Sequence, residues 1–323
     1  FDAAVLSGDR RALARAITLI ESTRRDHRAQ AGQLLEALMP HAGGSIRVGI
    51  SGAPGVGKST FIEALGNHVI DEGLKPAVLT VDPSSAISGG SILGDKTRME
   101  TLARRPEAFI RPSPAGTTLG GVTRRSRETL LLCEAAGFDV IFVETVGVGQ
   151  SETRVAEMTD MFLLLLQPGA GDELQGIKRG ITELADLILI NQADDGRAPL
   201  ADRSAGEYRH ALQLLRPRST NWQVEVATCS ARDKVGIDIA WDAIKRHQQA
   251  LEDSGELETL RAGQARHWLW SEVQDRLVAD LRDQFGDSTL ISELEAAVSA
   301  GRMPATTAAE RLLDHYLEQQ RHD

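Results

Sequence analysis

A glycine-rich stretch that ends in a lysine and a serine has the residue types and spacing of a phosphate-binding loop. It fits the pattern GxxxxGK[ST] and consists of Gly52, Ala53, Pro54, Gly55, Val56, Gly57, Lys58, Ser59 and Thr60. Glycines let the backbone curl so that successive N–H groups point at phosphate oxygens, and a helix N-terminus adds partial positive charge. Lys58 would reach the β- and γ-phosphates, and the Ser59 hydroxyl would bind Mg²⁺. The stretch therefore predicts a nucleotide-phosphate site.

Acidic residues at the ends of two predicted strands are expected to complete a magnesium site. Asp82 directly follows one apolar run, and Glu144 ends another. Carboxylates at the carboxyl ends of parallel strands suit Mg²⁺ and its waters. Asp95 is a further loop carboxylate. Because Glu144 to Gly147 resembles the DxxG switch of GTPases, with Glu in place of Asp, we expect the Gly147 N–H to donate to a γ-phosphate oxygen.

Two short motifs in the second half of the chain predict guanine as the base. Asn191 and Asp194 occupy the outer positions of the [NT]KxD motif, and Gln192 stands where lysine is usual. The Asp194 carboxylate can accept hydrogen bonds from guanine N1–H and the 2-amino group, a pattern that adenine does not present. Downstream, Ser230 and Ala231 resemble the short loop that places a backbone N–H on guanine O6. Because Gln192 lacks the positive charge of the usual lysine, we expect a lower affinity for the guanine nucleotide.

The elements that must position these motifs follow from the hydrophobic pattern. Between residues 45 and 254, short apolar runs alternate with amphipathic stretches such as the one at 58–70, which predicts strands joined by helices in a mostly parallel sheet with helices on both faces. The expected strands are 46–51, 76–81, 108–111, 139–144, 161–167, 186–191 and 223–229. The chemistry-bearing residues follow these runs, at the strand ends where such sheets bind ligands.

Helical segments flank the predicted α/β domain on both sides. Residues 1–44 are expected to form an N-terminal helical extension, and residues 255–323 a C-terminal helical region. Apolar residues line up at helical spacing in three stretches after Gly255. Because these helices have too little core of their own, we expect a homodimer contact to cover them, with folding back on the same chain as the alternative.

Composition excludes several classes of function. The chain has 323 residues, with 36 Lys+Arg against 46 Asp+Glu and a formal net charge of −10, which argues against a general nucleic-acid or anionic-membrane binder. No apolar stretch is long enough to span a membrane. Cys133 and Cys229 form no CxxC pair, so reduced thiols and a cytoplasmic location are expected. Because the sequence begins at Phe1, the removal of an organellar targeting peptide stays open as an alternative.

Together these residues resemble the MeaB/ArgK family of P-loop GTPases, the methylmalonyl-CoA mutase-associated G-protein chaperones. The resemblance covers nearly the whole chain. It is carried by the glycine-rich loop and by long loop sequences, among them GGSILGDKTRM at 89–99, TLGGVTR at 118–124, LLCEAAGFDVIFVETVGVGQSE at 131–152 and GDELQGIKRG at 171–180. It implies an α/β P-loop NTPase fold, a SIMIBI-class G domain, with an N-terminal helical extension and a C-terminal helical dimerisation arm.

The resemblance also implies a function. GTP and GDP with Mg²⁺ would be the ligands, and GTP hydrolysis would gate adenosylcobalamin loading and protect methylmalonyl-CoA mutase or a related acyl-CoA mutase. Carried over by position, Lys58, Glu144 and Gly147 act in hydrolysis, and Ser59, Asp82, Asp95 and Glu144 belong to the Mg²⁺ and switch network. Asp172 and Lys178 would lie in an extra switch segment that relays the nucleotide state to the mutase, although periodicity alone predicts an ordinary helix start there.

The catalytic machinery is sparse in the sequence. Gln150 lies three residues beyond Gly147 and not directly after it, and no arginine finger is identifiable. We therefore expect slow intrinsic hydrolysis that the partner accelerates. Three other classes stay open: a nickel-insertion GTPase, which usually carries Cys/His clusters, a small-molecule ATP-dependent kinase, and a scaffold that binds nucleotide without hydrolysis.

Overall fold

The computed structural model describes residues 1–22, 24–81, 99–112, 119–145, 151–169, 179–213, 218–285 and 288–320. Within them the chain forms two compact units, Phe1–Gln264 and Ala265–Asp323. Each unit is described separately below. The functional division into 1–44, 45–254 and 255–323 stays a prediction.

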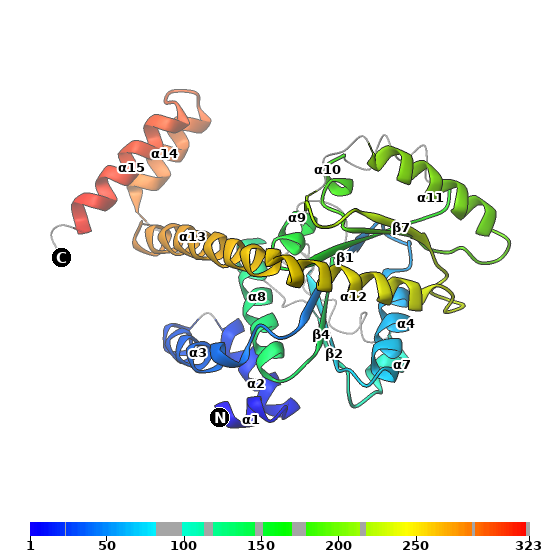
Figure 1. Ribbon diagram of the computed structural model, residues 1–323. Coiled ribbons are helices and arrows are strands. Elements are labelled where there is room, and N and C mark those ends of the chain that lie inside the picture. The colour runs from blue at the N-terminus through cyan, green and yellow to red at the C-terminus, as the bar shows by residue number, and fades with distance from the viewer. Residues whose placement is uncertain are drawn as a thin grey trace. The chain divides into compact units, whose positions relative to one another are not determined.

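A sheet of parallel strands forms the centre of the first unit (Figure 1). In the described part of the chain it has seven strands in the order β3-β2-β4-β1-β5-β6-β7. Their bounds are β1 (Ile46–Gly52), β2 (Pro76–Val81), β3 (Phe109–Arg111), β4 (Val140–Thr145), β5 (Met161–Leu166), β6 (Leu187–Ile190) and β7 (Glu225–Thr228). Each coincides with a predicted apolar run, which confirms the α/β parallel-sheet fold class.

Helices cover both faces of this sheet (Figure 1). The core on one face joins α4 (Lys58–Asp71) and α12 (Ile237–Ser254) to the strands, and α11 (Ala198–Leu212) packs on the other face over β6 and β7. The short α9 (Ser151–Ala156) approaches β1 so closely that a Cβ added at Gly49 would lie 2.7 Å from Val155 Cγ1. The short helices α7 (Glu100–Ala103) and α10 (Arg179–Thr182) complete the loops between strands.

Three N-terminal helices and a fourth helix from later in the chain pack together on one side of the first unit. They are α1 (Asp2–Leu6), α2 (Arg10–Glu21), α3 (Arg25–Leu38) and the longer α8 (Leu119–Ala135), and a 3₁₀ turn at Met39–His41 leads to the sheet. α8 packs against both α2 and strands β2 and β4, so it joins the extension to the sheet. One face of α2 is apolar and buried throughout: Ala12, Leu13, Ala16, Ile17 and Ile20.

Buried ion pairs fix the entry into β1. Arg47 donates from its guanidinium to Glu134 at 2.8 and 2.9 Å, and its backbone N–H donates to Asp160 Oδ2 at 2.9 Å. Asp160 also accepts from Arg261 Nε at 2.9 Å and Nη2 at 2.7 Å. The Arg261 guanidinium further donates to the carbonyls of Gly43 and Ser45. The side chains of Glu134 and Asp160 are 0% exposed, so both pairs are shielded from water.

The second unit is helical. The 30-residue α13 (Glu256–Phe285) begins in the first unit, and its later residues join α14 (Thr289–Ser299) and α15 (Ala305–Gln320). The Phe285 ring lies 5.4 Å from the His315 ring and 6.3 Å from the Tyr316 ring, measured between centroids. Several large apolar side chains of these helices stay more than half exposed in the single chain: Leu269, Trp270, Leu277, Val278, Leu313 and Leu317.

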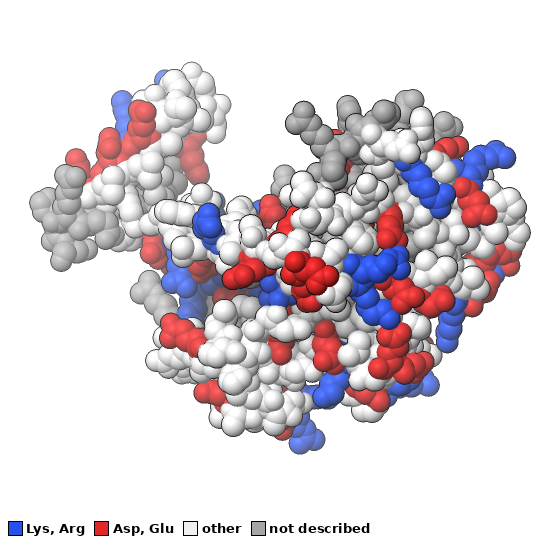
Figure 2. Space-filling view, viewed as in Figure 1, with Lys and Arg blue, Asp and Glu red and all other residues white. Residues whose placement is uncertain are grey.

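On the face drawn in Figure 2, acidic and basic side chains are interspersed. Among the described helices, none combines the length and the apolar character needed to cross a membrane.

Candidate nucleotide-binding site

The glycine-rich loop joins β1 to α4, as the motif requires. Gly57 has a φ of +90°, and a Cβ added there would lie 2.9 Å from Asn191 Nδ2. A Cβ added at Gly52 would collide with the carbonyl oxygen of Leu165 on the neighbouring strand β5. Glycine is therefore needed at both positions, at Gly57 for a left-handed backbone and at Gly52 for close approach of two strands.

The Lys58 ammonium lies against this loop. Its Nζ donates to the carbonyl oxygen of Gly52 at 2.8 Å and to that of Ala53 at 3.3 Å. These contacts hold the cation beside the N-terminus of α4, which carries partial positive charge. A phosphate on the loop N–H groups would thus meet a side-chain cation and a helix N-terminus together.

Two of the predicted magnesium ligands come together. The Ser59 hydroxyl at the start of α4 donates to Glu144 Oε1 at 3.3 Å, and Glu144 is only 4% exposed. A hydroxyl and a carboxylate oxygen fit Mg²⁺, which prefers oxygen ligands and takes the rest of its shell from waters and substrate phosphates. Within the described ranges no group of three or more His, Cys, Asp and Glu side chains could hold a metal ion by itself.

Asn191 connects the base-recognition loops to the phosphate loop. Its Nδ2 donates to the carbonyl of Val56 at 2.9 Å, and its Oδ1 accepts the backbone N–H of Ala231 at 3.0 Å. Cys229 Sγ lies 3.5 Å from the same Oδ1. One buried side chain therefore ties together the end of β6, the end of β7 and the phosphate loop. The N–H of Ala231 already has this partner, so its role toward guanine O6 stays a prediction.

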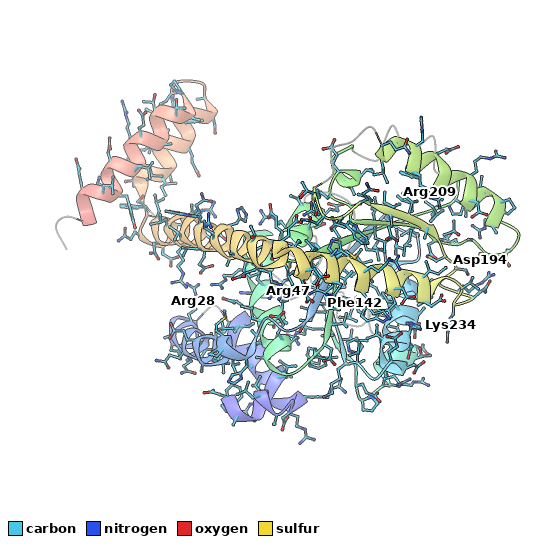
Figure 3. All side chains as sticks on the ribbon, viewed as in Figure 1. Arg28, Arg47, Phe142, Asp194, Arg209 and Lys234 are labelled. Carbon is cyan, nitrogen blue, oxygen red and sulfur yellow. The ribbon has the colours of Figure 1, made fainter. Side chains whose placement is uncertain are left out.

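Asp194 is positioned by the second base loop and flanked by two arginines. The Ser230 hydroxyl donates to Asp194 Oδ2 at 3.0 Å, and Asp194 is 8% exposed. Arg197 and Arg232 approach the carboxylate at 3.7 and 3.8 Å. Figure 3 shows Asp194 at the end of the sheet where α12 begins. The hydroxyl and guanidinium neighbours hold the carboxylate in a fixed orientation, which suits an acceptor for guanine N–H groups.

Sequence reasoning missed both of these arginines. Arg232 forms a two-point pair with Asp195 at 2.6 and 2.8 Å, and these hydrogen bonds raise the pKa of the guanidinium above its ordinary value. Arg197 also reaches Gln192. Arg232 follows Ala231 directly and Arg197 lies three residues after Asp194, so proximity to the two motifs was the available signal.

Gln192 replaces the usual lysine in a way that keeps a contact with the phosphate loop. Its φ is +63°, its Nε2 donates to the Gly55 carbonyl at 2.9 Å, and its Oε1 accepts from Arg197 at 3.3 Å. The amide thus forms a neutral bridge between the two loops. The positive charge that lysine would bring is supplied nearby by Arg197.

The remaining predicted residues lie outside the described residues. They are Asp82, Asp95, Gly147, Gln150, Asp172 and Lys178. Their roles stay predictions.

Replacing Asp194 by Asn is expected to weaken GTP binding by about 10- to 100-fold, because hydrogen bonds to a charged acceptor contribute roughly 1.5–3 kcal/mol. The Asn amide can donate to the 2-oxo group of xanthine, so xanthosine triphosphate should bind better than to the unmodified chain. Calorimetry with GTP and with xanthosine triphosphate measures how the two affinities change. Asp202→Asn, on the exposed side of α11, is the matched control and should leave both affinities unchanged. Unchanged GTP affinity in Asp194→Asn would contradict the base assignment.

Replacing Gln192 tests the bridge to Gly55. Gln192→Ala removes one hydrogen bond and should weaken GTP binding by roughly 3- to 10-fold, in line with about 0.5–1.5 kcal/mol for a neutral bond. Gln192→Lys can reach the same carbonyl and should stay within about threefold of the unmodified chain. Equal affinities for all three proteins would mean that the bridge does not support the nucleotide site.

Comparison with known proteins identifies the family. Residues 13–285 match the family model described as methylmalonyl Co-A mutase-associated GTPase MeaB. The chain is 52% identical to GTPase ArgK of Escherichia coli over 85% of this chain and 83% of that protein. It is 46% identical to the mouse (Mus musculus) protein named methylmalonic aciduria type A homolog, mitochondrial, over 96% and 77% of the two chains.

A solved structure agrees with this family assignment. The crystal structure of an LAO/AO transport system kinase superposes with a TM-score of 0.77 at 40% identity, covering 98% of this chain and 96% of that one. The resemblance deduced from the motifs is thereby confirmed. The chain belongs to the MeaB family of methylmalonyl-CoA mutase-associated GTPases.

Proposed function

We propose that this chain binds and slowly hydrolyses GTP and uses that cycle to gate adenosylcobalamin loading of methylmalonyl-CoA mutase, or of a related acyl-CoA mutase, and to protect the mutase. Family membership supports the GTPase part, and the names of the family and of the mouse relative support the mutase as partner. Calorimetric competition between GTP and ATP tests the first step. Preference for ATP would favour the alternative of a small-molecule kinase.

The observation that carries the proposal is the bridge made by Asn191. It joins the phosphate loop at Val56 to the base loop at Ala231, where the neighbouring Ser230 hydroxyl donates to Asp194. A nucleotide with its phosphates on the loop would present its base to Asp194. Because Asp194 accepts and does not donate when ionised, guanine is the purine that matches it.

Hydrolysis would depend on positioning and charge. Bound Mg²⁺ would neutralise charge on the β- and γ-phosphates, held by Ser59 with Glu144. Lys58 would stabilise the negative charge that shifts toward the leaving phosphate, and the loop N–H groups would orient the phosphates. Gly147, Asp82 and Asp95 are proposed to complete this network.

The partner part of the proposal predicts stimulation. Purified mutase should raise the rate of phosphate release by reshaping the switch segments, among which Asp172 and Lys178 are proposed as the relay. Rates of GTP hydrolysis with and without mutase measure this directly. Asp172→Ala and Lys178→Ala should lose the stimulation and keep the basal rate. Equal rates with and without the mutase would contradict the partner-coupled cycle.

A pull-down separates the chaperone from the other classes. Mutases captured by the chain loaded with GDP or with a non-hydrolysable GTP analogue should differ in amount, because the switches would present different surfaces. Capture of none in either state would demote the chaperone proposal. If no phosphate is released even in the presence of mutase, the chain would be a nucleotide-binding scaffold. If the chain captures a metallocentre enzyme only when nickel is present, the metal-insertion alternative would be favoured.

We also propose that the chain is a homodimer through its C-terminal helices. The exposed apolar side chains of α13 and α15 are a natural contact because a large apolar area in water is unfavourable. Replacing Trp270 and Leu277 by Glu should convert dimer to monomer in analytical ultracentrifugation, whereas Leu200→Glu on α11 should not. A cytoplasmic location, with both buried thiols reduced, is proposed with it.

A further inference from the structure

A cavity of about 610 Å³ lies on the N-terminal side of the first unit, between α2, the start of α3 and α8. Figure 1 shows these three helices side by side, and the packing of α2 on both α3 and α8 agrees with that view. The polar side chains that line the cavity are Arg15, Thr18, Glu21, Ser22, His27 and Arg125. None of them belongs to the phosphate loop or to the base loops.

Arg125 is the residue that demands an explanation. It stands in the middle of α8, only 5% of its surface is exposed, and its Nε has no hydrogen-bond partner in the part of the chain that the structure describes. A buried N–H donor without an acceptor is costly, because it loses its hydration and gains no hydrogen bond in return. The carboxylates of Glu21 and Glu128 attract the Arg125 charge, but the Nε donor itself stays without an acceptor, so an anion that entered the cavity would satisfy it.

Glu21, the acidic side chain that lines the cavity, is already paired with Arg111. Glu21 accepts from Arg111 Nη2 at 2.5 Å and from Arg111 Nε at 3.3 Å. The pKa of Arg125 is lowered below its ordinary value, first by burial and then by the neighbouring Arg124, while the carboxylates of Glu21 and Glu128 oppose this shift. Arg28, labelled on α3 in Figure 3, adds to this lowering.

A second arginine, Arg15, also lines the cavity. Arg15 is exposed on α2, and its guanidinium lies 5.8 Å from the centre of the Phe1 ring. The His27 ring on α3 is held at 2.8 Å from the Ser22 hydroxyl, so it is fixed at the rim. Two guanidiniums thus face one space on a protein whose net charge is −10.

We propose that this cavity is a binding site for a small organic anion that carries a carboxylate or phosphate group, with Arg125 and Arg15 as its cationic ligands. A guanidinium presents parallel N–H donors that match the oxygens of either group, and this match gives specificity as well as affinity. The volume is much larger than a simple inorganic ion needs, so there is room for the body of a metabolite. The site is independent of the proposed GTPase function.

The test uses the full chain saturated with GDP and Mg²⁺, so that the phosphate loop is occupied. Inorganic phosphate and succinate are titrated separately and followed by calorimetry and by the ¹⁵N signals of the arginine Nε–H groups. We expect saturable binding of at least one probe and a shift of the Arg125 signal, assigned through its absence in Arg125→Lys. Phosphate binding alone indicates a phosphate ligand, and succinate binding alone a carboxylate ligand.

Variants locate the binding. Arg125→Met and Arg15→Met keep the apolar stems and should weaken binding of the probe by at least tenfold. Arg24→Met, which removes an exposed arginine paired with Asp26 near the cavity, should leave binding unchanged. If Arg125→Met does not fold, the shift of the Arg125 Nε–H signal on adding the probe to the unmodified chain shows whether the probe binds at this cavity. Absence of saturable binding by both probes, or binding that Arg125→Met leaves unchanged, overturns the proposal.

Discussion

Replacing Lys58 by Ala is expected to lower kcat/KM for GTP hydrolysis by about 10²- to 10³-fold, because a preorganised charge at the reacting phosphate has an effect of that size. Lys58 Nζ rests on the carbonyls of Gly52 and Ala53, so its removal takes away the cation without disturbing a packed core. The fold should survive, as circular dichroism and the thermal midpoint would show.

The measurement is phosphate release at saturating and limiting GTP, which separates lost binding from lost turnover. Lys75→Ala, an exposed lysine just before β2, is the matched control and should retain full activity. An unchanged rate of GTP hydrolysis in Lys58→Ala would contradict the assignment of the phosphate site. It would leave the anion site at Arg125 untouched, since that site shares no residue with the loop.

Replacing Asp160 by Ala is expected to lower the free energy of unfolding by roughly 3–5 kcal/mol, the usual effect of removing one partner of a buried ion pair. The change would leave the Arg261 guanidinium and the Arg47 backbone N–H without the oxygens they now share. Since Asp160 Oδ atoms are shielded from solvent, water cannot replace the carboxylate fully.

Urea unfolding of Asp160→Ala, Arg261→Met and the double variant measures the coupling between the two side chains. The double variant should be more stable than the sum of the single losses predicts, because neither charge is then left alone. The exposed pair Arg24–Asp26 serves as a control, and Arg24→Ala should cost less than about 1 kcal/mol. Equal losses for the exposed and the buried pair would contradict the argument from burial.

The sheet was predictable because parallel strands buried on both faces have nearly continuous apolar sequences. Runs such as MFLLLL of β5 and LILI of β6 have few polar residues, so their type and order stand out. Their ends were less exact: β7 begins at Glu225, two residues later than predicted. The glycine-rich loop was predictable for a different reason, since close approach at Gly52 and positive φ at Gly57 tolerate few other residues.

The contacts that join distant segments could not be predicted. Arg261 and Asp160 are separated by about a hundred residues, and nothing in either local pattern indicates the pair. Arg125 was equally hidden, because a charged residue on an amphipathic helix is ordinarily assigned to the solvent face. Only the packing of α2 and α3 on α8 reveals that this position is covered. The neighbours of Asp194 were missed because loop conformations carry no hydrophobic period.

The central place of β1 in the sheet has a consequence for synthesis on the ribosome. β1 pairs with β4 on one side and β5 on the other, and Met161 of β5 lies 161 − 52 = 109 residues after Gly52. At roughly 5–20 residues per second, translation of this interval takes about 5–20 s. Until β4 has been made, both edges of β1 lack their partners, and until β5 has been made one edge still does, so nascent chains of this length expose unpaired strand edges that favour aggregation.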